Sequence, residues 1–75
     1  MTSPAWSSAV AVTKSDTTEV VFEALYIGGT GDVAIEDFHG QQTTFVAVPA
    51  GGYVICRGRK VLETGTDATS IVAIS

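Results

Sequence analysis

Cys56 and His39 are the single cysteine and the single histidine of this chain. A thiol beside an imidazole can act as a nucleophile and its base, provided that the fold brings the two together and a third group orients the base. Cys56 lies in an apolar, strand-like stretch, where a buried and unreactive thiol is the commoner arrangement. The sequence therefore predicts no catalytic residue and favours a protein that is not an enzyme.

Glu36, Asp37 and His39 place oxygen and nitrogen ligands close together, as a metal site requires. Adjacent residues of a strand point to opposite faces of a sheet, so Glu36 and Asp37 cannot easily converge on one ion. We expect no metal and no cofactor.

The run Gly28-Gly29-Thr30-Gly31-Asp32 has the glycine content of a phosphate-binding loop. Such loops open a helix and some add a lysine, whereas here another strand-like stretch follows and no lysine is present. The run is therefore predicted to be a tight β-turn in which glycines adopt positive φ.

Arg57-Gly58-Arg59-Lys60 contains three of the four basic residues. The cluster could bind phosphate, pair with carboxylates on a neighbouring chain, or be a solvated strand face. Arginine is enriched in protein interfaces. With eight acidic residues against four basic ones, the chain as a whole is repelled by nucleic acid, so we expect no nucleic-acid partner. Subunit contact and simple exposure both remain open.

Trp6 lies near the N-terminus, where it could cover the core or anchor the chain on a partner. We treat Trp6 as a candidate contact residue, together with Tyr26 and the basic residues of the 57–60 cluster. The full set of candidate partner-contact residues is Trp6, Tyr26, Arg57, Arg59 and Lys60.

The elements that must position these residues are all strands, because β-branched residues alternate along the chain and no helical period is sustained. Predicted strands span residues 8–13, 20–27, 32–38, 43–48, 53–63 and 69–75. A hairpin turn is expected at 39–41, and Gly58 indicates a bulge or a close backbone approach. The prediction is an all-β fold, a small antiparallel β-sandwich or barrel of five to six strands. Residues 1–8 are expected to be an N-terminal arm and residues 9–75 a single β domain.

The chain has 75 residues, of which 45% are hydrophobic and 16% charged, and a net charge of -4. A domain of this size buries a small core and is marginally stable alone. One cysteine cannot form an internal disulfide, so assembly into a homo-oligomer is the expected support. No apolar run approaches membrane-spanning length, and no basic residue precedes the apolar N-terminal stretch as in a signal peptide. We expect a soluble protein made in a cytoplasm, with no membrane partner.

Three segments carry a resemblance to a known family. They read ALYIGGTGD over residues 24–32, TFVAVPAG over residues 44–51, and VLETGTDATSIVAI over residues 61–74. In this order and spacing they resemble small virion proteins of tailed phages and gene transfer agents, in particular the spike base proteins. Ile55, Gly58, Ser75 and the 37–39 stretch depart from that pattern.

The resemblance implies a structural virion protein, a capsid-surface spike base or head decoration subunit assembled in the bacterial host cytoplasm. The implied partners are further copies of the chain, the major capsid protein and a head fibre or spike protein. A tail or head–tail connector component is an alternative. A small nucleic-acid-binding β-barrel is the alternative from another class, since such modules combine stacking aromatics with a basic groove.

Overall fold

The computed structural model describes residues 8–75, which form seven β-strands and no helix. The strands are β1 (Ala9–Ala11), β2 (Ala24–Gly29), β3 (Gly31–Glu36), β4 (Gln42–Val48), β5 (Gly52–Val54), β6 (Lys60–Val61) and β7 (Thr69–Ile74). Within these residues, no helix has the length and hydrophobicity needed to cross a membrane.

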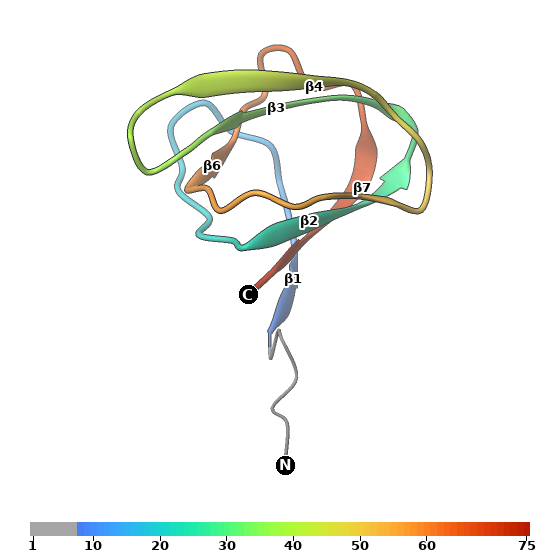
Figure 1. Cartoon of the computed structure of the whole chain (residues 1–75), viewed down its shortest axis with the longest axis horizontal. Helices are drawn as coiled ribbons and strands as arrows, with labels where there is room; N and C mark the ends of the chain where they lie inside the picture. The colour runs from blue at the N-terminus through green and yellow to red at the C-terminus, as the bar shows by residue number, and fades with distance from the viewer. Residues whose placement is uncertain (1–7) are drawn as a thin grey trace.

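The strands form two sheets, one of four strands in the order β1-β7-β2-β5 and one of three strands in the order β4-β3-β6. All strand pairs are antiparallel. Figure 1 shows β3 and β4 in an upper layer, with β2 and β7 in a lower layer. The all-β antiparallel prediction is confirmed. The strand predicted over 69–75 is confirmed as β7, which lies between β1 and β2.

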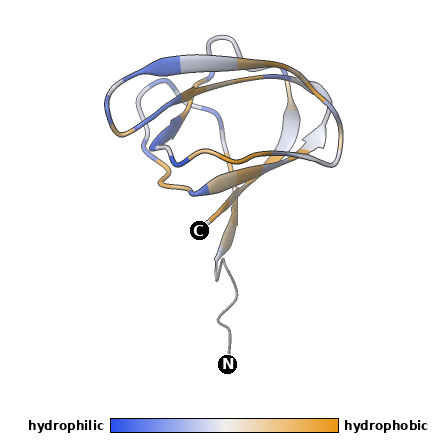
Figure 2. Ribbon diagram, in the orientation of Figure 1, coloured by the Kyte–Doolittle hydropathy of each residue, from blue (hydrophilic) through white to orange (hydrophobic). Residues whose placement is uncertain are grey.

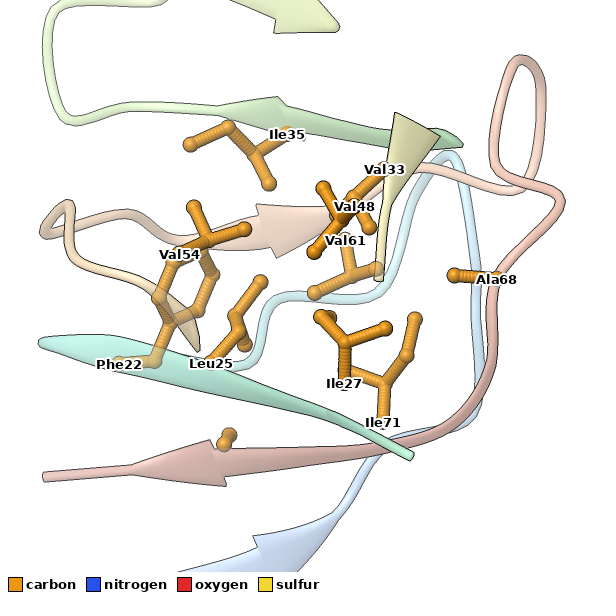
Figure 3. Close-up of a cluster of buried hydrophobic side chains, with 11 residues drawn as sticks. Phe22, Leu25, Ile27, Val33, Ile35, Val48, Val54, Val61, Ala68 and Ile71 are labelled. Atoms are coloured by element: carbon orange, nitrogen blue, oxygen red, sulfur yellow. The ribbon is translucent and has the colours of Figure 1, made fainter. Parts of the chain in front are cut away.

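The core fills the space between the two sheets. Figure 3 shows Val33 and Ile35 from the upper sheet directed toward Leu25 and Ile27 from the lower sheet. The largest fully buried side chains are Phe22, Leu25, Ile27, Ile35, Val33 and Val61. Alternate residues of β2 and β7 therefore face this core, and the residues between them face away from it.

The glycine run was predicted as a tight turn with positive φ, and that prediction is wrong. β2 continues through Gly29 and β3 begins at Gly31, so the chain passes from one sheet to the other through Thr30 alone. Described glycines with positive φ are Gly40, Gly51 and Gly65. Gly31 is needed for another reason, because a Cβ there would lie 2.5 Å from the backbone nitrogen of Ala68.

The run 53–63 was predicted as one strand, and the structure divides it into β5 and β6. Gly58, between them, exchanges two backbone hydrogen bonds of 3.0 Å with Phe22. A Cβ on Gly58 would lie 2.5 Å from Cζ of the Phe22 ring, which confirms the predicted close approach. This division brings the number of strands to seven, against the five to six expected. The strand expected over 20–27 also begins later, at Ala24.

The β6 edge of the three-stranded sheet is covered by the segment that precedes β2. The backbone N–H groups of Ser15 and Val20 donate to the carbonyl oxygens of Val61 and Arg59 at 3.0 and 2.8 Å. At the opposite edge of the sheet lies β4, whose side chains are exposed except for those of Phe45 and Val48. The predicted hairpin turn at 39–41 is confirmed between β3 and β4.

The predicted N-terminal arm falls almost wholly outside the described residues. Ser8, its last residue, exchanges two backbone hydrogen bonds with Ser75, of 2.7 and 2.9 Å. The division into an arm and a single domain therefore stays a prediction.

Ala47 sits in a bulge of β4 with a φ of 57°. The register with β3 shifts at this point, and Asp32 Oδ1 accepts a hydrogen bond from the Ala47 N–H at 2.9 Å. A non-glycine residue in this left-handed conformation costs about 1–2 kcal/mol, because its Cβ approaches the following carbonyl oxygen. The bulge is therefore held by Asp32 against a local strain.

Ala47→Gly is expected to raise the free energy of unfolding by about 0.5–1 kcal/mol, since relief of this strain exceeds the added freedom of the unfolded chain. Ala47 is exposed, so little packing is lost. Urea unfolding measures the change. Ala50→Gly, three residues along and without positive φ, is the matched control and should be destabilising. Equal effects of the two substitutions would contradict the prediction.

Candidate functional site

Two of the three basic side chains in the cluster bind one carboxylate of the same chain. Arg59 Nε and Nη2 lie 2.8 and 2.7 Å from Glu36 Oε2, and Lys60 Nζ lies 3.6 Å from the same oxygen. Glu36 is on β3, directly opposite Lys60 on β6. The hydrogen bond from Arg59, followed by that from Gln42, holds the pKa of Glu36 below its ordinary value. Glu36 therefore offsets one of the two positive charges in this part of the cluster within the chain.

Arg57 is the most exposed of the three. Its Nη2 lies 3.4 Å from Glu23 Oε2, and 67% of the Arg57 side chain is exposed. At such exposure an ion pair contributes little to stability and leaves the guanidinium accessible. Sequence reasoning missed the two glutamates because they lie 34 and 23 residues from Arg57 and Arg59. The contact roles of Arg57, Arg59 and Lys60 stay predictions, with Arg57 the freest to contact a partner.

Glu36→Gln is expected to lower stability at neutral pH and to reduce the stability lost on acidification. Because the folded pKa is lowered, charged Glu36 stabilises the fold above about 4.5, the ordinary pKa, and this contribution disappears as the pH falls through the lowered value. Glutamine does not titrate, so the Glu36→Gln variant loses less stability than the wild type as the pH falls through the lowered pKa of Glu36. Asp16 retains part of the pH dependence, since the backbone N–H and the hydroxyl of Thr64 lower its pKa.

Thermal unfolding midpoints at neutral and acidic pH measure this difference. Glu19→Gln is the control, because Glu19 is exposed and forms no ion pair with a described residue. A variant at Glu36 that loses as much stability on acidification as the wild type would contradict the assignment.

His39 and Cys56 line one open hollow of about 640 Å³. The Cys56 thiol donates to the carbonyl oxygen of Arg57 at 3.7 Å, and the backbone N–H of His39 donates to Asp37 Oδ1 at 2.8 Å. No hydrogen bond joins the thiol to the imidazole among the contacts of residues 8–75. This arrangement lacks the oriented nucleophile and base that thiol catalysis requires.

Glu36, Asp37 and His39 do not converge either. The described part of the chain holds no group of three histidine, cysteine or acidic side chains placed to bind a metal ion. Glu36 is engaged by Arg59, while Asp37 accepts backbone hydrogen bonds from His39 and Gln41 at 2.8 and 2.9 Å. These backbone donors, that of Gln41 foremost, lower the pKa of Asp37 and fix the β3–β4 turn.

Tyr26 packs against Tyr53 on the neighbouring strand. The ring centroids lie 5.3 Å apart at an angle of 69°, an edge-to-face contact. The two residues are directly opposite in the register of β2 and β5, and Val72 of β7 lies opposite Tyr26 on its other side. Sequence reasoning found Tyr26 but missed Tyr53, whose place is set by the pairing of β2 with β5.

These tyrosines belong to a sheet without charge. All four basic and eight acidic residues lie between residues 14 and 37 or between 57 and 67, and none is in β1, β2, β5 or β7. We call the side of this sheet that points away from the core the uncharged face. It consists of Ala9, Ala11, Ala24, Tyr26, Tyr53, Val72 and Ile74. Trp6, the remaining candidate contact residue, lies outside the described residues.

No protein-family model matches this chain, and no curated protein matches it. Among solved structures, it is similar to a chain from the capsid of a native gene-transfer-agent (GTA) particle computed with C5 symmetry. The two are 28% identical with a TM-score of 0.81, over 91% of this chain and 81% of that chain. The likeness supports the expected structural virion protein of the phage and gene-transfer-agent class.

Proposed function

We propose that this chain is a non-catalytic structural subunit on the capsid surface of a phage-like particle, as a spike base or head decoration protein. The single observation that carries the proposal is the similarity to a chain of the GTA capsid across 91% of the sequence. The proposed partners are further copies of the chain, the major capsid protein and a head fibre or spike protein. The particle is assembled in the bacterial host cytoplasm.

The charge distribution supports a role in packing between proteins. Interface cores are depleted in charged residues and enriched in aromatic residues, while interface rims are polar. The uncharged face has no charged residue and contains two tyrosines, and Arg57 with Glu23 forms an exposed ion pair close to Ala24 in the chain. The ion pairs of Arg59 and Lys60 with Glu36 reduce the positive charge of the basic groove that a nucleic-acid-binding barrel would need.

Particles produced with and without the gene for this chain test the proposal. Cryo-electron microscopy is expected to show density on the outer capsid surface that is absent from the deletion particles and returns when purified chain is added. Density confined to the tail or to the head–tail junction would support the connector alternative and overturn the capsid-surface role. Absence of the chain from purified particles would overturn a structural virion role altogether.

A further inference from the structure

The uncharged face differs from the outer face of an ordinary antiparallel sheet. Such sheets normally alternate apolar residues toward the core with polar residues toward solvent. Here the outward residues that the register pairs across β1, β7, β2 and β5 are alanine, valine, isoleucine or tyrosine. Ser70, exposed near the start of β7, is the polar residue that continues this alternation. Tyr53 is 53% exposed, Ala9 and Ala11 are exposed, Tyr26, Val72 and Ile74 are half-buried, and Ala24 is fully buried among its neighbours. In Figure 2 this sheet has no strongly hydrophilic stretch beyond the start of β2.

Electrostatics identifies the kind of partner that this face suits. Each copy has a net charge of -4, so two copies that met through their charged segments would bring mostly like charges together. The uncharged face is a surface through which identical acidic chains can pack without that repulsion. Glu23, which directly precedes Ala24 in the chain, and its partner Arg57 give each copy one exposed anion and one exposed cation, which can pair reciprocally between copies.

The sizes of the side chains add a shape argument. The register row runs Ala11, Val72, Tyr26, Tyr53 across the sheet from the β1 edge to the β5 edge. Side chains thus grow from small to large along the row. When two such faces meet about a two-fold axis parallel to the strands, β5 of one copy lies over β1 of the other. In this row Tyr53 then lies over Ala11 and Tyr26 over Val72, so that each large side chain meets a smaller one, as close packing requires.

We propose that the uncharged face packs against the same face of a second copy of this chain. The contact places Tyr53 of each copy over Ala9 and Ala11 of the other, and Tyr26 of each copy over Val72 of the other. It deepens the homo-oligomer part of the proposed function and does not depend on where in the particle the chain resides.

Two substitutions on adjacent residues of β1 test this contact. Ala11→Lys adds bulk and charge to the uncharged face, whereas Val10→Lys makes the same charge change on the opposite side of the strand. Ala11 and Val10 are both exposed, so both variants should fold, and an unfolding midpoint checks this for each. Tyr53→Lys is a second disrupting variant from the other edge of the sheet. Sedimentation of the purified full chain over a range of concentrations gives the mass.

The wild type is expected to sediment at twice the mass of the 7.8-kDa chain. Ala11→Lys and Tyr53→Lys should raise the dissociation constant about tenfold or more, and Val10→Lys should change it less than about twofold. A wild type that stays monomeric, an assembly with an odd number of copies, or equal effects of the lysine at positions 10 and 11 would each overturn the inference.

Adding purified wild-type chain to particles that lack it separates this inference from the proposed function. A monomeric chain that binds the particles would overturn the dimer contact and leave the virion role intact. A dimer that Ala11→Lys dissociates, but that does not bind the particles, would support the contact and count against the virion role.

Discussion

Gly31→Ala is expected to lower the free energy of unfolding by about 3 kcal/mol, the upper end of the usual cost of overpacking. A Cβ at this position would lie 2.5 Å from the nitrogen of Ala68 and 2.7 Å from the carbonyl carbon of Asp67. Both neighbours are backbone atoms, and they cannot move away freely. The N–H groups of Asp67 and Ala68 both donate to the carbonyl oxygen of Asp32, at 2.8 and 3.1 Å. Making room for the methyl group would break that junction between β3 and β7.

Urea unfolding of Gly31→Ala beside Gly51→Ala separates this clash from backbone strain. Gly51 has a φ of 82° and no atom within 4 Å of an added Cβ, so its alanine variant should lose only about 1 kcal/mol. If Gly31→Ala is no more destabilising than Gly51→Ala, the close approach of the two backbones does not limit this position.

Gly31 also illustrates which parts of the fold could be predicted from sequence. Alternation of β-branched residues placed strands close to β2, β3, β4 and β7, because that period is a local property of the chain. The reason for the glycines is not local. It depends on β7 and the segment before it, nearly forty residues further along, crossing the end of β2 at short distance. Three glycines in four positions looked like a turn because the crossing segment cannot be seen in the sequence.

The candidate site divides in the same way. The basic cluster at 57–60 and Tyr26 were visible as residue types, and the uncharged stretches could be read directly. The role that these residues have in the site depends on which strands pair in the folded chain. Glu36 reaches Arg59 through the pairing of β3 with β6, and it converts two of the cluster's cations into internal partners. The uncharged face arises because the sheet order β1-β7-β2-β5 brings together strands that are far apart in the chain.

The distribution of charge bears on why so small a chain would assemble. Charged residues concentrate on β3 and β6, on the segments around β6, and on the segment between β1 and β2, where ion pairs and turns use them. The four-stranded sheet receives none, so its outer face carries no repulsive charge against an identical copy. A core of this size gives limited stability, and burial of that face on a second copy would supplement it.

How small that stability is can be tested by deleting one core side chain. Phe22→Ala is expected to lower the free energy of unfolding by about 3–5 kcal/mol, since Phe22 is fully buried and its ring packs against Gly58. Native domains have only about 5–15 kcal/mol in total, so this variant should be close to the limit of folding. Phe38→Ala is the matched control, because Phe38 is 47% exposed and should lose about 1 kcal/mol or less. Both substitutions are measured by urea unfolding in a chain that also carries Ala11→Lys, so that a second copy does not contribute to the stability of either variant. A Phe22→Ala chain that unfolds at the same urea concentration as Phe38→Ala would show that the core is not built around Phe22.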